Sequence, residues 1–114
     1  MSERDPRVIL DEMLQCIALI RSYTTGLTAE TFEQQQALQD AIVHRIEILG
    51  EAASQLPDTV KSQHTDIPWR VIVDMRNRLI HGYFAVRLDL VWQVATTDIP
   101  ALETQLHALR DSLP

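Results

Sequence analysis

The chain has 114 residues, which is enough for one domain, and we expect a single domain over residues 1–114. Hydrophobic residues make up 46% of it and glycines number only three, a composition that favours helices over a β-rich fold. One cysteine excludes an internal disulfide and a cysteine-based metal cluster, and fits a cytoplasmic protein. No signal peptide is expected, and no apolar run approaches the ~18 residues of a membrane span.

The charge is unevenly distributed along the chain. The net charge is −6, which argues against a broad nucleic-acid-binding surface. Residues 61–87 nevertheless carry a net charge of +3, and the remainder carries −9. Unless the clustering is due to chance, it predicts a local cationic site on an acidic protein.

Two helices are predicted in the first half of the chain. The first begins with Asp5 as N-cap and Pro6 at the first helical position, and ends before Gly26. The second runs from Thr28 to about Ser54, with a length of ~38 Å. Apolar residues recur at helical spacing in both. The first helix has Val8, Ile9, Leu10, Met13, Leu14, Ile17 and Ile20 in these positions.

Residues 57–67 read as a polar connector with space for one short helical turn. A third helix is predicted to begin near Pro68, with Trp69 as an anchor in the core. Gly82 would follow that helix as its C′ residue.

Residues 83–88 are predicted to form a loop, and Asp89 is predicted to cap a fourth helix. Pro100 should kink or break this helix, because proline lacks the backbone N–H. The fold class is therefore all-α, an antiparallel up-and-down helical bundle. The wide apolar stripes also favour a homodimer, although stripes in a bundle normally form its core.

A group of polar residues able to act on a phosphate lies in the stretch "MRNRLIHGYF", residues 75–84. The Arg76 side chain offers a fork of donors for phosphate oxygens, and His81 can transfer protons near neutral pH. Together they could cleave RNA without a metal. The Tyr83 hydroxyl could bind substrate or be modified. No cofactor or metal is expected, because the other histidines show no metal-ligand spacing.

The spacing of this stretch sets a geometric condition. On an ideal helix Arg76 and His81 would lie about 140° apart around the axis, whereas Asn77 and His81 would share a face. Either the helix loosens before Gly82, or two copies of the chain contribute groups to a shared cleft. Asn77 would then orient His81 or a phosphate. In the alternative interpretation, these residues only stabilise a helix C-terminus.

The sequence resembles a known family. "MRNRLIHGY" is similar to the Arg-x(4–6)-His motif of the HEPN superfamily, and Arg-x4-His-x-Tyr resembles the HepT toxins in particular. The segments "ILGEAASQLP" at 48–57 and "IPWRVIVDMRN" at 67–77 are also similar to that family, so the resemblance covers nearly the whole chain.

The resemblance implies a specific function. HepT-like proteins are helical homodimers that act as metal-independent endoribonuclease toxins of type VII toxin–antitoxin systems. Their antitoxin is a minimal nucleotidyltransferase of the MntA type, which blocks the site by AMPylation of the motif tyrosine. By this resemblance Arg76 and His81 would be catalytic, Asn77 would support them, and Tyr83 would accept AMP.

Other residues have two interpretations each. Arg78 and Arg87 could contact RNA or a partner, or could have an exposed structural role. Glu51, four residues after Glu47, fits a solvated helix face, but could orient Arg76 or contact the partner protein. Trp69 and Trp92 are expected to anchor the core, and Cys16 to be buried.

Two other functions stay open from sequence alone. The chain could be a non-catalytic helical dimer that binds and regulates a nucleotidyltransferase partner. It could also be a purely structural dimer.

Overall fold

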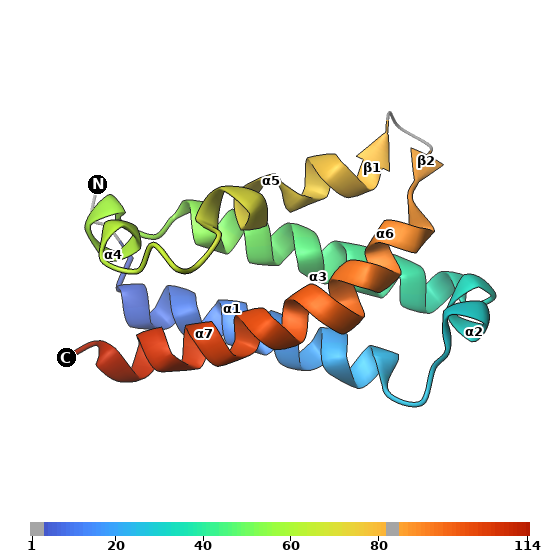
Figure 1. Ribbon diagram of the computed structural model, residues 1–114, viewed down its shortest axis with the longest axis horizontal. Helices are drawn as coiled ribbons and strands as arrows, with labels where there is room; N and C mark the ends of the chain where they lie inside the picture. The colour runs from blue at the N-terminus through green and yellow to red at the C-terminus, as the bar shows by residue number, and fades with distance from the viewer. Residues whose placement is uncertain (1–3, 82–84) are drawn as a thin grey trace.

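Long antiparallel helices form the frame of the structure, a computed structural model that describes residues 4–81 and 85–114. Helix α1 (Pro6–Thr24) packs against both α3 (Gln36–Ser54) and α7 (Ile99–Ser112). Helix α5 (Trp69–Leu79) packs on α3 (Figure 1). The predicted all-α, antiparallel bundle is confirmed.

Helix α1 begins as its sequence predicts. The Asp5 side chain accepts a hydrogen bond from the Arg7 backbone N–H at 2.9 Å, and Pro6 is the first helical residue. The chain leaves the helix through Gly26, whose φ of +78° is a conformation that glycine adopts without strain. Cys16 is buried on the inner side of α1, and burial raises the pKa of its thiol. Val8, by contrast, is 48% exposed and does not belong to the core.

The single long helix predicted from Thr28 to Ser54 is wrong, because the chain forms two helices there. Thr28 caps α2 (Ala29–Glu33) through a capping box with Thr31, and α3 follows a break at residues 34–35. The break lets Phe32 turn into the core, where its ring lies 5.2 Å from that of Trp92. The buried Gln39 Nε2 donates to the Phe32 carbonyl oxygen at 2.8 Å and holds α2 against α3.

The connector contains the expected helical turn, α4 (Asp58–Ser62), and α5 begins at Trp69. The Trp69 indole Nε1 donates to the His64 carbonyl oxygen at 3.0 Å, which fixes the entry into α5. Helix α5 ends at Leu79, three residues before Gly82, so the prediction of Gly82 as its C′ residue is wrong. Gly82 itself lies outside the described residues.

A short hairpin follows α5 in place of further helix. Strands β1 (Ile80–His81) and β2 (Ala85–Val86) pair antiparallel, with His81 opposite Ala85. The Arg87 backbone N–H donates to the Leu79 carbonyl oxygen at 2.8 Å and closes the base of the hairpin. Part of the predicted loop at residues 83–88 is therefore a strand.

The last helical segment is continuous but changes its winding. Helix α6 (Leu88–Gln93) begins after Arg87, so Asp89 lies in its first turn and is not its N-cap as predicted. A π-helical segment, η1 (Val94–Asp98), then leads into α7. The Ile99 N–H bonds the Val94 carbonyl oxygen, five residues back, so the chain changes to π-helical winding just before Pro100 where a kink or break was predicted.

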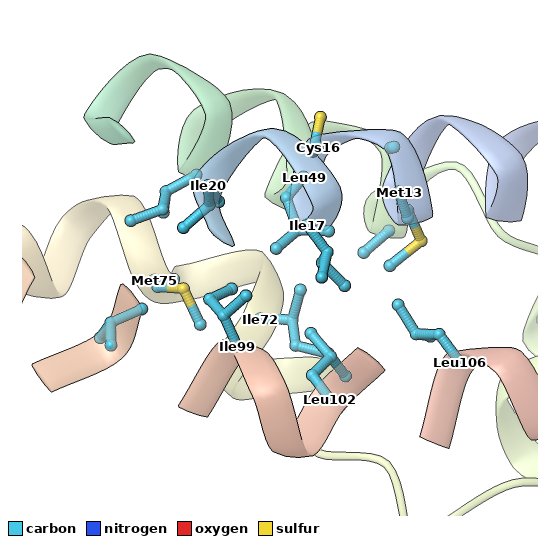
Figure 2. Close-up of a cluster of buried hydrophobic side chains, with 14 of the residues drawn as sticks. Met13, Cys16, Ile17, Ile20, Leu49, Ile72, Met75, Ile99, Leu102 and Leu106 are labelled. Carbon is cyan, nitrogen blue, oxygen red and sulfur yellow. The ribbon is translucent and has the colours of Figure 1, made fainter. Parts of the chain in front are cut away.

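One cluster of buried apolar side chains fills the space between these helices (Figure 2). Helices α1, α3, α5 and α7 all contribute to it. Trp69 and Trp92 pack against this cluster and stay partly exposed, in agreement with their predicted anchoring role. None of the helices in the described parts of the chain is long and apolar enough to cross a membrane. The labelled members in Figure 2 are Met13, Cys16, Ile17, Ile20, Leu49, Ile72, Met75, Ile99, Leu102 and Leu106.

Candidate active site at the hairpin after α5

The candidate catalytic residues lie on two different elements. Arg76 belongs to the last turns of α5, and His81 belongs to β1. The 140° angle of an ideal helix does not apply, because regular helix ends at Leu79. The helix therefore stops before Gly82, as the first of the two sequence-based alternatives requires. The side chains of Arg76 and His81, and all of Tyr83, lie outside the described residues, so their roles stay predictions.

The position of α5 depends on a close approach to α3. A Cβ atom added at Gly50 would lie 3.0 Å from the Ile72 carbonyl oxygen and 3.4 Å from that of Val73. Ala52 and Ala53, which follow on α3, are buried with 3% and 0% exposure. The "GEAA" segment is thus a run of small residues that lets the backbone of α5 lie against α3, and Glu51 is its exposed member.

Asn77, predicted to support catalysis, has a partner on its own helix. Its Nδ2 donates to Asp74 Oδ1 at 2.8 Å, and both side chains are exposed. The Asn77 amide could contact a phosphate or His81 through its Oδ1 atom or its second N–H. The N–H bonded to Asp74 would become available only after this hydrogen bond breaks. Sequence reasoning missed Asp74, although the i, i+3 spacing with Asn77 was visible.

The two further arginines occupy different places. The Arg87 guanidinium bonds both carboxylate oxygens of Asp89, at 3.4 and 3.2 Å, at the base of the hairpin. The bond to Arg87 lowers the pKa of Asp89. Arg78 borders a cavity of about 300 Å³ between α5, η1 and α7, together with Asp98. The two arginines thus have different neighbours, Asp89 for Arg87 and the lining of this cavity for Arg78.

A smaller cavity of about 180 Å³ lies between α3 and the β2–α6 segment. Val43 and Glu47 of α3 line it, and Val86 and Leu88 line it from the hairpin side. Glu47 is half-buried and has an interaction of its own, so the solvated face expected for it is only partly present. Gln39 also lines the cavity and was missed by sequence reasoning, although a glutamine within the apolar stripe of α3 was a visible signal.

No metal-binding cluster is formed by the described residues. Over residues 4–81 and 85–114, no group of three or more histidine, cysteine, aspartate or glutamate side chains could hold an ion.

Comparison with known proteins identifies the family. Residues 13–109, which include the whole motif, match the family model described as "Ribonuclease HepT-like". The chain belongs to the HepT-like family. Over 108 residues it is 34% identical to a protein of Thermococcus cleftensis named "Probable ribonuclease HepT", covering 95% of this chain and 98% of that protein.

Two further relatives of this HepT-like chain carry RNase names. A Caldanaerobacter subterraneus protein named "Putative RNase" is 35% identical over 93% of this chain and 95% of its own length. A Methanocaldococcus jannaschii protein named "Gamma-glutamylcyclotransferase and putative RNase" is 38% identical over 96% of this chain. The HepT-like chain spans only half the length of that protein. No solved structure gives a significant match.

Proposed function

We propose that this HepT-like chain is a metal-independent endoribonuclease. The main support for this proposal is the membership of the HepT-like family, because the family match includes residues 76–81. The three relatives described above have names that include a ribonuclease activity. The fold adds a physical reason, because the hairpin places His81 at a helix end rather than within a regular helix.

Arg76 and His81 would divide the chemistry between them. His81 would transfer the proton in attack of the 2′-hydroxyl on phosphorus or in departure of the 5′-oxygen. The P–O5′ bond would break as the 2′-oxygen bond forms. Arg76 would stabilise the added negative charge on the phosphorane, and Asn77 would orient the phosphate or His81. We propose that two copies form a homodimer and contribute these residues to one cleft.

The chain would act in the cytoplasm as the toxin of a type VII toxin–antitoxin system. An MntA-type nucleotidyltransferase antitoxin would transfer AMP to Tyr83. Each AMP would place a negative phosphodiester and a bulky base two residues from His81, and would repel or obstruct an RNA phosphate.

Cleavage of a labelled RNA by the purified chain, with and without EDTA, tests the activity. We expect cleavage that persists in EDTA and is lost in Arg76→Ala and His81→Ala. His107→Ala, at an exposed position on α7, is the matched control and should retain activity. Equal cleavage by all variants, or cleavage abolished by EDTA, would refute the metal-independent Arg/His mechanism.

The antitoxin is tested by co-expression with a nucleotidyltransferase encoded next to this chain. We expect mass increases in multiples of one AMP, which Tyr83→Phe removes. An adduct that persists in Tyr83→Phe would place the acceptor at another residue. If the purified chain cleaves no RNA but binds the nucleotidyltransferase tightly, the non-catalytic regulatory dimer is the correct alternative.

A further inference from the structure

The cavity of about 300 Å³ between α5, η1 and α7 is a groove with an apolar floor. Helix α5 packs on α3, whereas α7 packs on α1 and η1, so the groove marks a line along which α5 and α7 are not packed closely together. Met75 and Leu102 lie at its base and are almost fully buried. Val71 also lines the groove and is 42% exposed. A partner seated here would remove this apolar surface from water.

Two opposite charges border the same groove. Arg78 lies on α5 and Asp98 lies on η1, and both side chains are exposed. Within the part of the chain that the structure describes, neither side chain takes part in a hydrogen bond or an ion pair. By contrast, Arg110 of α7 pairs with Asp11 of α1 at 2.9 Å. The groove therefore presents one cation and one carboxylate that are both available to a partner.

Such a pair of charges makes the groove complementary to itself. In a contact with two-fold symmetry every interaction occurs twice, because residue i of one copy meets residue j of the other and the reverse. Arg78 of each copy would meet Asp98 of the other, and Val71 of each copy would cover the apolar floor opposite. Complementary charges also fix the register of such a contact and disfavour other partners.

The groove lies apart from the proposed catalytic cleft. Two residues advance about 200° around a helix, so the positions of Arg76 and Arg78 lie on nearly opposite sides of α5. A second copy seated at Arg78 would therefore leave the side of α5 at position 76 uncovered. The groove is thus a separate surface from the cleft that two copies are proposed to share.

We infer that this groove binds a second copy of the chain through two reciprocal ion pairs between Arg78 and Asp98, with Val71 buried in the contact. If the catalytic cleft also joins two copies, the groove joins two such dimers. If it does not, the groove joins two single chains. In both cases association through the groove doubles the mass, because a two-fold contact closes on itself. The inference does not depend on ribonuclease activity.

Light scattering during gel filtration of the full chain tests the contact. Arg78→Glu alone should place two pairs of carboxylates against each other, and Asp98→Lys alone should place two pairs of cations against each other. Each variant should associate at least about a hundredfold more weakly than the wild type and have about half its mass. An equimolar mixture of the two variants should regain the wild-type mass, because Glu at 78 in one copy then meets Lys at 98 in the other.

The mixture separates a contact between copies from an ion pair within one chain, because neither variant can form the pair within its own chain. A mixture that keeps the reduced mass would overturn the inference. A wild-type mass equal to that of both variants at every concentration would also overturn it. Circular dichroism should show that both variants remain folded, since the two changed side chains are exposed.

Matched variants test the apolar part of the contact. Val71→Asp should halve the mass, because it places a carboxylate in the apolar contact. Val8→Asp is the control, since Val8 is 48% exposed on α1 and does not line the groove. Asp111→Lys, an exposed charge reversal at the far end of α7, should also keep the wild-type mass. If Val8→Asp or Asp111→Lys lowered the mass as much as the groove variants do, the contact would not lie in the groove.

The outcome can be told apart from that of the proposed function. Asp98→Lys should halve the mass and still cleave RNA, whereas His81→Ala should lose cleavage and keep the wild-type mass. If the wild type cleaves no RNA but the mixture regains the wild-type mass, the ribonuclease proposal fails and the groove contact stands. If the wild type cleaves RNA and no groove variant changes the mass, the groove contact fails and the ribonuclease proposal stands.

Discussion

Replacement of Gly50 by alanine should destabilise the protein although alanine is the better helix former. Alanine in a helix interior gains about 1 kcal/mol over glycine. The new methyl group would lie 3.0 Å from the Ile72 carbonyl oxygen and 3.4 Å from that of Val73, both in the backbone of α5. Overpacking costs about 1–3 kcal/mol, and here only a shift of the whole of α5 could relieve it. We therefore expect a net loss of about 1 kcal/mol in the free energy of unfolding.

Urea unfolding followed by circular dichroism measures this loss. The midpoint should fall without a change in m, and the melting temperature should drop by about 4 °C. Glu51→Ala is the matched control, because it changes the adjacent exposed residue of α3 and should shift stability by less than about 0.5 kcal/mol. If Gly50→Ala were more stable than the wild type by about 1 kcal/mol, helix propensity alone would govern this position. The close approach of α3 and α5 would then be refuted.

Two further changes test the packing of α2 and the ion pair at the hairpin. Phe32→Ala should lower the free energy of unfolding by about 3–5 kcal/mol, because the ring is fully buried and contacts Trp92. Urea unfolding measures this loss, and a value below about 1 kcal/mol would contradict the burial of Phe32. Arg87→Gln should raise the pKa of Asp89 toward its ordinary value, because the hydrogen bond from Arg87 lowers this pKa in the wild type. An NMR titration of Asp89 measures the change, and an unchanged midpoint would contradict the pairing of Arg87 with Asp89. With a lowered pKa in the folded state, the pair stabilises the protein above the unfolded pKa of Asp89, and this contribution is lost as the pH falls through the folded value.

The starts of α1 and α2 were predictable because their signals are local. Asp5 and Pro6 stand next to each other in the chain, and the bonds that begin α1 reach only two to four residues ahead. The cap at Thr28 is equally local, since its partner is Thr31. Such contacts need no tertiary structure, so the sequence contains all that decides them.

The ends and breaks of helices were harder to predict because distant residues decide them. Residues 33–36, "EQQQ", contain no glycine or proline, and nothing local ends a helix there. The helix breaks because Phe32 is buried against Trp92, sixty positions later in the chain. Leu79 likewise ends α5 because its carbonyl oxygen accepts from Arg87, and Ile80 pairs with Val86.

The sequence by itself determined the helical fold class, the order of the main helices and the motif that marks the HepT-like family. These follow from periodicity and from spacing along the chain, which tertiary packing does not alter. Only the tertiary structure decided that the helix stops before His81, that Gly50 brings α5 against α3, and that Gln39 faces a cavity beside the hairpin. These three features depend on which distant segments of the chain meet, because burial and strand pairing decide them and local helix propensity does not.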